Sequence, residues 1–421
     1  MSASKTIPRL AGLDHTLAFL REGYQFISHH CDELKTDIFA ARILLQPVIC
    51  VRGSEAAEMF YGRGHFTRQG AMPTTTMRLL QDKGSVQQLD GAAHRHRKAM
   101  FVELLMTAEA ETQLVHLFRS EWLQALDGWA NRPSIVLLDE ANLVLARAIC
   151  GWMNVPLDGK SDADMAFELS SMIENAGSVG PAVLMALGRR RRTERFIEKL
   201  VTQIRDGKTA IPADAPIALI ASHRDFDGKR LSESAAAVEI LNILRPTVAI
   251  GRFVMFAALT LQDHPDRRAA LHGADDARYE RFAEEVRRLY PFFPVIGGKA
   301  KEAFEWKGHP FQPGDWVLLD LHGTNHDPRL FRNPEQFDPD RRLSWRDQGN
   351  DFIPQGAGNA RTDHRCPGEQ FTVAIIREAS RLLVEQMDYE VPEQDLSMPL
   401  SRMPAKPASG MILANVRRKT A

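Results

Sequence analysis

The segment from Phe352 to Phe371, FIPQGAGNARTDHRCPGEQF, limits most strongly what this chain can fold into. It reads as a glycine-containing loop that leads to Cys366, followed by Pro367 and Gly368 and then by residues with helical periodicity. A cysteine just before a helix N-terminus meets free N–H groups and the positive end of the helix dipole, and both stabilise a thiolate. Proline suits the first turn of a helix, and glycine allows close approach of another group. The segment therefore predicts a thiolate metal ligand at Cys366, although a Cys-Pro-Gly turn alone would also fit a loop cysteine without a special role.

The other three cysteines, Cys31, Cys50 and Cys150, lie in mixed or apolar stretches. No two cysteines form a CxxC pair, so the sequence indicates neither a zinc ribbon nor a thioredoxin-like site. We expect these three to be small buried hydrophobic residues rather than a disulfide framework.

Composition narrows the class of protein. The chain has 421 residues, of which 44% are hydrophobic and 25% charged, as is typical of a globular protein. The formal net charge of -1 gives no reason to expect nucleic acid or an anionic membrane as a partner. No apolar run approaches the roughly 18 residues that a membrane helix needs, and residues 1–13 lack the layout of a signal peptide. We therefore expect no transmembrane segment and a cytoplasmic location.

Hydrophobic periodicity predicts a mainly α-helical chain with a small β-rich part and without internal repeats. The expected helices are Arg95 to Met106, Glu109 to Ala130, Asp139 to Cys150, Ala163 to Ala176, Thr193 to Arg205, a long apolar helix from Ser234 to Gln262, Asp276 to Leu289 and Gly368 to Met387. Ser232 is the expected N-cap of the long helix. A strand is expected at Ile43 to Arg52, a hairpin at residues 304–321 and a turn-rich stretch from Gly323 to Phe352.

Three further segments stand in order with the cysteine loop. They are Glu285-Val286-Arg287-Arg288, the stretch from Asn333 to Arg341, and the stretch from His94 to Lys98. A Glu and an Arg three residues apart are on their own an everyday helix pair, worth about 0.2–0.5 kcal/mol. Together with the cysteine loop, however, these segments resemble the cytochrome P-450 superfamily over essentially the whole chain.

This resemblance implies one haem-thiolate domain over residues 1–421. The implied fold is the mainly α cytochrome P-450 fold, a helical prism with a small β-rich part, with haem b between the long central helix and the cysteine loop. Cys366 would be the axial ligand of the iron, and Glu285 and Arg288 would form a buried structural ion pair. Other implied contacts to the cofactor, chiefly to its propionates, come from His94, Lys98, His364 and Arg365.

The long helix departs from the usual pattern of that superfamily. Ordinary members activate O2 and carry an acid followed by Thr on this helix, whereas here Arg245-Pro246 occupies that place. The loop near Cys366 is also longer than usual. Both departures resemble one branch, the bacterial fatty-acid peroxygenases, which use hydrogen peroxide. The segments that carry this resemblance are Leu244 to Ala249, Tyr290 to Pro294, Phe352 to Gly356 and Leu89 to His94.

Arg245 itself indicates an anionic ligand. An arginine within an apolar helix is costly without an anionic partner, and its neighbours one turn away, Leu241 and Ala249, are not acids. Glu239 lies on another face, so an outside carboxylate held by a bidentate guanidinium is a reasonable partner. The residues alone leave open a salt bridge to a distant acid, and the resemblance favours the carboxylate site.

Two other features of these helices bear on that interpretation. Pro246 lacks an N–H and leaves the Asn242 carbonyl free, so we expect a kink that opens room over a flat cofactor. Arg252 is a rival for the carboxylate, without support from any motif. The run from Arg189 to Arg192 is expected to be a solvated helix face without a function.

The peroxygenase resemblance implies a mechanism. A long-chain fatty acid would bind with its carboxylate on Arg245, and this carboxylate would act as the acid–base group for O–O cleavage of hydrogen peroxide. Hydroxylation at C2 or C3 would follow, without a redox partner protein. The catalytic residues would be Arg245, Pro246 and Gln87, and the substrate-binding residues would be Arg245, Asn242, Phe292 and Phe293.

The resemblance leaves the product and the reaction class partly open. Members with His at the Gln87 position resemble a branch that decarboxylates fatty acids to terminal alkenes, whereas Gln favours hydroxylation, provided that the alignment does not slip to Gln88. The context of Phe292 and Phe293 favours C2 over C3, although either phenylalanine could also be an ordinary core residue. The alternatives are decarboxylation, an O2-dependent monooxygenase and, in another class, a non-catalytic haem sensor.

Overall fold

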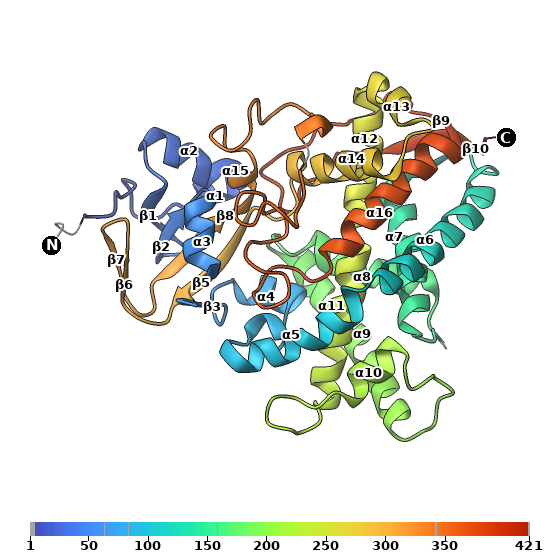
Figure 1. Cartoon of the computed structure of the whole chain (residues 1–421), viewed down its shortest axis with the longest axis horizontal. Helices are drawn as coiled ribbons and strands as arrows, with labels where there is room; N and C mark the ends of the chain where they lie inside the picture. Colours follow the sequence, from blue (N-terminus) through green and yellow to red (C-terminus); the bar gives the residue numbers. More distant parts are fainter. Residues whose placement is uncertain (1–4, 63, 83, 158, 342, 420–421) are drawn as a thin grey trace.

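The fold divides into a helical part and a smaller β-rich part, which lie side by side along the long axis of the molecule (Figure 1). The computed structural model describes residues 5–62, 64–82, 84–157, 159–341 and 343–419. The described part of the chain begins at the β-rich end and finishes at the helical end (Figure 1). The cysteine loop and the long apolar helix face each other where the two parts meet.

The helices of the large part form around one hydrophobic core. They are α5 (Gly91–Leu105), α6 (Ala108–Trp129), α7 (Leu137–Met153), α8 (Asp162–Glu174), α9 (Pro181–Arg205), α10 (Pro216–Ser222), α11 (Glu233–Ala249), α12 (Gly251–Asp263), α13 (Pro265–Leu271), α14 (Asp276–Leu289) and α16 (Glu369–Arg381). Trp122, Leu244 and Ile375 are fully buried in this core. The prediction of a mainly α-helical fold is confirmed.

The β-rich part contains a five-stranded sheet in the order β1-β2-β8-β5-β3. Its strands are β1 (Ile38–Ile43), β2 (Gln46–Val51), β3 (Phe66–Thr67), β5 (Val295–Ala300) and β8 (Trp316–Asp320). Short helices accompany it: α1 (Thr16–Glu22), α2 (Phe26–Glu33), α3 (Ser54–Gly62), α4 (Thr74–Leu80) and α15 (Leu321–Asn325). The hairpin expected over residues 304–321 is found only over its first half, as β6 (Phe304–Trp306) with β7 (His309–Phe311), because β8 pairs with β2 and β5 instead. A separate three-stranded sheet joins β4 (Ser134–Val136), β10 (Ile412–Arg418) and β9 (Met387–Glu390).

The strand predicted at Ile43 to Arg52 is partly wrong. Ile43 ends β1, Leu44 and Leu45 adopt positive φ angles of 54° and 60°, and the second strand begins at Gln46. The two residues form a tight turn between antiparallel strands, which pair Ile43 with Gln46. A hairpin therefore replaces the single strand, because an apolar pair can occupy a turn when the flanking strands fix it.

The long apolar helix occurs as two helices in line. Ser232 caps α11 by accepting the Ala235 N–H, as predicted. The break falls at Ile250, between α11 and α12, one turn after Pro246, rather than at the proline itself. By length and composition the stretch Glu233–Asp263 could cross a membrane, but its most apolar window is 94% buried inside the molecule.

Two predicted helix boundaries are corrected. Helix α9 begins at Pro181, twelve residues before the expected start at Thr193, so the run from Arg189 to Arg192 lies inside it. Arg190 in this run is only 2% exposed, and the expectation of a fully solvated face is wrong for this residue. Helix α16 ends at Arg381, and one π-helical turn, Leu382–Gln386, completes the segment expected to be helical as far as Met387.

Candidate active site

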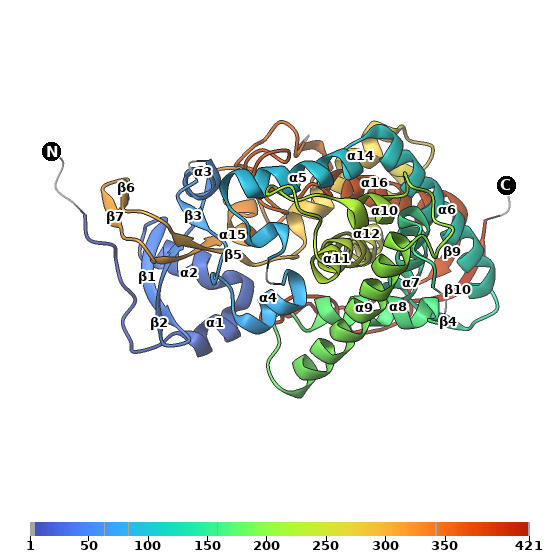
Figure 2. The ribbon, with the colours of Figure 1, turned by 90° about the horizontal axis from the view of Figure 1, so that it is seen from below.

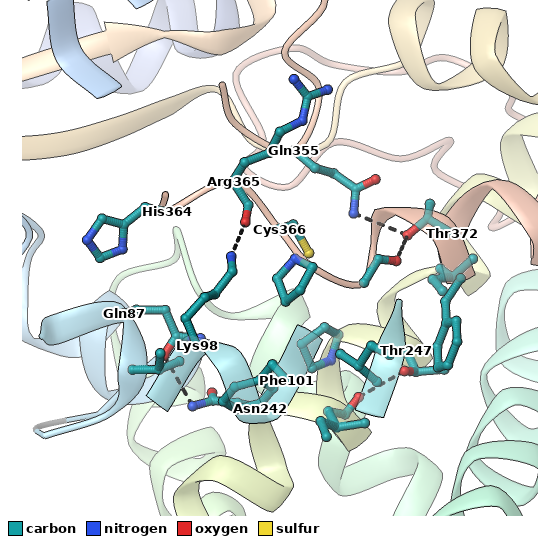
Figure 3. Close-up of a pocket in the computed structure, with 18 of the residues that line it drawn as sticks. Gln87, Lys98, Phe101, Asn242, Thr247, Gln355, His364, Arg365, Cys366 and Thr372 are labelled. Carbon is teal, nitrogen blue, oxygen red and sulfur yellow. Dashed lines mark hydrogen bonds between the residues drawn. The ribbon is translucent and has the colours of Figure 1, made fainter. Parts of the chain in front are cut away.

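The Cys366 side chain points into a cavity between the cysteine loop and α11 (Figure 3). On the loop side the cavity is lined by Cys366, Gly368 and Phe371, and on the helix side by Ile243, Pro246 and Thr247. Gly356 turns the loop at a φ of 101°, and a Cβ there would lie 2.7 Å from the Tyr61 hydroxyl. The glycine is therefore needed both for its backbone angle and for the close approach of Tyr61.

Cys366 lies just before the N-terminus of α16, which affects the charge state of its thiol. Helix α16 begins at Glu369 without a side-chain cap, so its first N–H groups face the sulfur end of the loop. Burial raises the pKa of the Cys366 thiol, and the nearby Glu369 raises it further, whereas Lys98 and a hydrogen bond from the Gly368 backbone lower it. A metal cation at the sulfur would overcome the effect of burial and favour the thiolate.

Beneath the cysteine, a buried ionic cluster fixes the loop. The Arg365 guanidinium donates to both carboxylate oxygens of Glu369, at 2.7 and 3.1 Å, and to the Gly349 and Phe352 carbonyls. Arg287 joins Glu369 to Glu284. The expectation that the Arg365 side chain reaches a propionate is therefore corrected, because Glu369, four residues further along the chain, binds the guanidinium instead.

A second ionic cluster contains the expected pair. Arg288 donates to Glu285 at 2.7 and 2.9 Å, and both side chains are fully buried. Arg341 also donates to Glu285 at 3.2 Å, and the Asp338 N–H does so at 3.0 Å. The stretch from Asn333 to Arg341 thus completes the network around Glu285 and Arg288, and it ties the loop region to α14.

Basic side chains gather at one end of the cavity. The rings of His94 and His364 lie 3.9 Å apart, and Lys98 donates to the carbonyls of Asp363 and Arg365. Burial, together with the nearby charge of Lys98, lowers the pKa of His94 to about 4. This cavity fits an iron-porphyrin: it has one sulfur ligand, an apolar slot with a glycine beside the sulfur, and a basic end for two carboxylates. Among the described residues no cluster of three or more His, Cys, Asp or Glu could hold a metal ion instead.

Arg245 lies on the opposite side, where a second cavity extends from the cysteine past α11. Its side chain is 3% exposed and donates to the carbonyls of Leu79, at 3.3 Å, and Leu80, and to the Asn242 amide oxygen at 3.1 Å. None of the ion pairs found in the described part of the chain includes Arg245. Burial lowers the pKa of its guanidinium well below the usual value, and the charge of Arg190 adds to this effect.

Arg252, the rival arginine, has an internal partner. It forms an ion pair with Glu174 and donates to the Ala405 carbonyl at 2.6 Å. The internal salt bridge that the sequence left open for Arg245 is therefore found at Arg252. Of the two buried arginines on this helical stretch, Arg245 is the one with an unmatched charge beside the cavity.

Asn242 and Gln87 connect Arg245 to the rest of the site. The Asn242 amide nitrogen donates to the Gln87 side chain at 3.2 Å and to Glu239 at 2.9 Å (Figure 3). Glu239 is fully buried and also accepts from Arg97 and from the Val86 N–H. Gln87 lines both cavities, whereas Gln88 donates to Gln81 at 2.6 Å, so the assignment to Gln87 rather than Gln88 is supported.

Phe292 and Phe293 both line the second cavity, and their rings lie 4.4 Å apart. Beyond them a third, strongly apolar cavity continues toward α1 and the turn of β1 and β2. The residues that line both cavities are Met72, Thr76, Leu80, Ile173, Phe292, Phe293 and Val295. An apolar channel thus runs from Arg245 toward the surface.

No Asp or Glu is among the described residues that line the first two cavities. Thr247 lines the first cavity, but its hydroxyl donates to the Ile243 carbonyl of its own helix at 2.9 Å. The acid–alcohol pair of O2-activating relatives is thus missing from the site as well as from the sequence.

Comparisons with known proteins agree with this geometry. A profile of the cytochrome P450 family matches residues 280–413. The structure matches cytochrome P450EX alpha (CYP152N1) with myristic acid at a TM-score of 0.94 and 40% identity, over 99% of this chain and 100% of that one. It matches cytochrome P450SP alpha (CYP152B1) in complex with (R)-ibuprophen at 0.93 and 42% identity, over 96% and 99%. The chain belongs to the cytochrome P450 family.

A third cytochrome P450 structure, a variant of OleT in complex with arachidonic acid, matches at a TM-score of 0.94 and 31% identity, over 99% of this chain and 100% of that one. The resemblance to the fatty-acid peroxygenase branch is confirmed by these relatives. This cytochrome P450 is accordingly a haem-thiolate oxidoreductase with haem b as its cofactor.

Some members of this cytochrome P450 site were not expected from the sequence. Glu284, Arg287 and Glu369 form the cluster under the cysteine, although Glu284 and Arg287 repeat the spacing of the expected pair one residue earlier. Arg68 is buried near the two histidines and donates to the Gly297 carbonyl at 2.9 Å. No local signal distinguishes Arg68 from a surface arginine, because its burial depends on β5.

Proposed function

We propose that this cytochrome P450 uses hydrogen peroxide to hydroxylate long-chain fatty acids at C2, C3 or both, with the substrate carboxylate on Arg245. The observation that carries the proposal is the buried Arg245 guanidinium, which lies at the inner end of an apolar channel and forms no ion pair with any acid of the described residues. The similar structures with myristic acid, arachidonic acid and (R)-ibuprophen support it, because each of these ligands is a carboxylic acid.

Arg245 would bind the carboxylate through its positive charge and through directional hydrogen bonds. A guanidinium in a cavity shielded from water binds a carboxylate with charge-assisted hydrogen bonds, which are stronger than neutral ones. The Asn242 amide oxygen and the Leu79 and Leu80 carbonyls hold the guanidinium from behind. The apolar tail would pass Phe292 and Phe293 into the outer cavity, where long-chain pockets are expected to be apolar.

The bound carboxylate would also supply the acid–base group that the protein lacks. When bound, the haem supplies the chemistry that inserts an oxygen atom of hydrogen peroxide into a C–H bond. A carboxylate oxygen takes the proton from one oxygen of hydrogen peroxide and returns it to the other, so that the O–O bond breaks and water leaves. Fatty acid and hydrogen peroxide then balance hydroxy acid and water, and no redox partner protein is needed.

The position of hydroxylation would follow from the fixed carboxylate. With the carboxylate beside α11, the carbons next to it lie nearest the cysteine cavity, which favours C2 and C3 over the distant tail. Pro246 lines both cavities and leaves the helix backbone without an N–H at this point. Gln87, a neutral amide, can hold water or substrate but is a poor proton donor, which favours hydroxylation over decarboxylation, and C2 is our first choice.

Anaerobic product analysis tests this proposal. The purified haem protein, myristic acid and hydrogen peroxide are incubated without reductase, and the products are identified by mass spectrometry. We expect 2- or 3-hydroxymyristic acid. A terminal alkene as the product would show that the enzyme decarboxylates fatty acids instead of hydroxylating them. The absence of any product, with turnover only after O2 and an electron donor are added, would contradict the peroxygenase proposal.

A decoy experiment tests the role of the carboxylate separately. A short carboxylic acid should occupy Arg245 and leave the cysteine cavity free for a small substrate that lacks an acid group. We expect the short acid to switch on peroxide-driven oxidation of that substrate, and to fail in Arg245→Ala. Equal oxidation with and without any short acid would contradict the role proposed for the carboxylate.

A further inference from the structure

Two buried arginines converge on the C-terminal end of α4. Arg190 from α9 and Arg245 from α11 both donate to the Leu79 carbonyl, at 3.0 and 3.3 Å, and Arg245 also donates to the Leu80 carbonyl. Figure 2 shows α4, α9 and α11 beside one another, and contacts join α9 to both other helices. The last carbonyls of a helix lack partners within it and carry partial negative charge, so they attract cations.

The two arginines differ in their acidic partners. Arg190, only 2% exposed, donates to Glu194 at 2.7 Å and lies 3.4 Å from a carboxylate oxygen of Asp82. Arg245 takes part in none of the ion pairs of the described residues, although Glu194 and Asp82 act on its charge through space. The two acids whose charges act on Arg245 are therefore paired with Arg190, and Arg245 is left with neutral oxygen acceptors.

Removing the Arg190 charge would change this distribution. The Glu194 side chain is 18% exposed, and a carboxylate this far shielded from water is destabilised without a cation, so it attracts any cation within reach. Arg245 shares an acceptor with Arg190 and is the cation that already experiences the field of these acids. An internal carboxylate drawn to Arg245 would compete directly with a ligand carboxylate.

We propose that Arg190 is a positioning residue for substrate binding: by forming ion pairs with Glu194 and Asp82, it keeps Arg245 available to the carboxylate of the ligand. This inference rests on the proposed function, in which Arg245 binds the fatty acid carboxylate. It gives the arginine run from Arg189 to Arg192 a role through its buried member alone. The affinity for carboxylates is set in part outside the cavity, since Arg190 does not line it.

Calorimetric titration of the haem-loaded protein tests the proposal with two ligands of equal tail length, myristic acid and 1-tetradecanol. We expect Arg190→Gln to weaken the binding of myristic acid by about tenfold or more, as for other losses of charge balance at a buried pair, and to leave 1-tetradecanol unchanged. Arg190→Lys keeps the charge and should bind both ligands nearly as the unaltered protein does. Equal weakening for acid and alcohol would overturn the proposal, because it would show a merely structural role for Arg190.

The double variant Arg190→Gln with Glu194→Gln gives the sharpest result. We expect it to recover most of the lost affinity for myristic acid, because the competing internal carboxylate is gone. Glu194→Gln alone, which leaves Arg190 in place, should bind myristic acid at least as tightly as the unaltered protein. Failure of the double variant to recover affinity, or a loss of affinity in Glu194→Gln, would overturn the proposal.

Two further variants separate this inference from the proposed function. Arg252→Gln removes another buried, paired arginine of the same helical stretch and is expected to leave the ratio of acid to alcohol affinity unchanged. Arg245→Ala should lose preferential binding of the acid. If Arg245→Ala binds myristic acid normally, the proposed function is wrong. If Arg245→Ala loses this binding but Arg190→Gln keeps it, the inference about Arg190 is wrong and the proposed function stands.

Discussion

The buried arginines around the active site differ in how their charge is balanced. On the cysteine side, Arg287, Arg288, Arg341 and Arg365 each pair with a glutamate of the protein. On the helix side, Arg245 is equally buried, but its acceptors are two carbonyls and an amide. Charge that is balanced inside the fold holds the cysteine loop in place, whereas charge left unbalanced is available to a ligand. The difference separates arginines that hold the site together from Arg245, for which we propose a role in ligand binding.

The largest effect is expected on the balanced side. Arg288→Met leaves Glu285 buried with one cation fewer, and we expect it to lower the free energy of unfolding by about 3–5 kcal/mol, with loss of haem. Chemical denaturation and the haem content of the purified protein measure this. Arg381→Met removes a partly exposed partner of Glu378 at the same i,i+3 spacing and should cost only about 0–1 kcal/mol. Equal losses in the two variants would contradict the importance of burial.

Arg245→Ala should give the reverse result. It removes a buried charge without an ionic partner among the described residues, so we expect the free energy of unfolding to stay the same or rise. Fatty acid affinity should fall by about 100-fold, in line with roughly 2–5 kcal/mol for a buried charged contact. Denaturation and calorimetric titration measure the two effects. A stability loss as large as that of Arg288→Met would abolish the contrast between the two sides.

Asp320, at the end of β8, extends the comparison to a buried acid. Burial raises its pKa to about 7 from the model-compound value of 3.8. Between these values the folded protein holds a proton that the unfolded chain has lost, so stability should fall as pH rises from about 4 to 7, by at most about 1.4 kcal/mol per pH unit. Asp320→Asn can still accept the Gly323 N–H and should remove this slope. Denaturation at several pH values checks this; an unchanged slope would show that Asp320 is ionised throughout.

The smallest effect is expected at Asn242. Its amide oxygen is the one side-chain acceptor of Arg245 among the described residues. Asn242→Ala should therefore loosen the guanidinium and weaken fatty acid binding by about fivefold, the equivalent of roughly 1 kcal/mol. A binding titration measures it, with Gln88→Ala as a control, because Gln88 bonds to Gln81 and does not line the cavities. A loss as large as that of Arg245→Ala would place the carboxylate on Asn242 itself.

The sequence predicted those features that depend on nearby residues. Helix α14, the Ser232 cap and the cysteine loop were all recognised from spacing and local chemistry. The burial of Arg190 was missed, because it depends on α4, which is more than one hundred residues earlier in the chain. Arg365 was oriented wrongly, although Glu369 lies one helical turn away, because a loop residue beside a cofactor has two acceptable anionic partners. The break in the long helix lies at Ile250, one turn after the kink predicted at Pro246, since a missing N–H permits bending without fixing where it occurs.

The two apolar cavities lie one after the other past Phe292 and Phe293. If Arg245 binds the acid end of every substrate, as we propose, all fatty acid chains start from the same point, and fatty acids of different length should be oxidised at the same carbon number. Length would be sensed only at the far end, where the methyl terminus reaches the outer cavity near α1. Changes around the outer cavity should thus alter which fatty acids are accepted while the position of the new hydroxyl group stays the same.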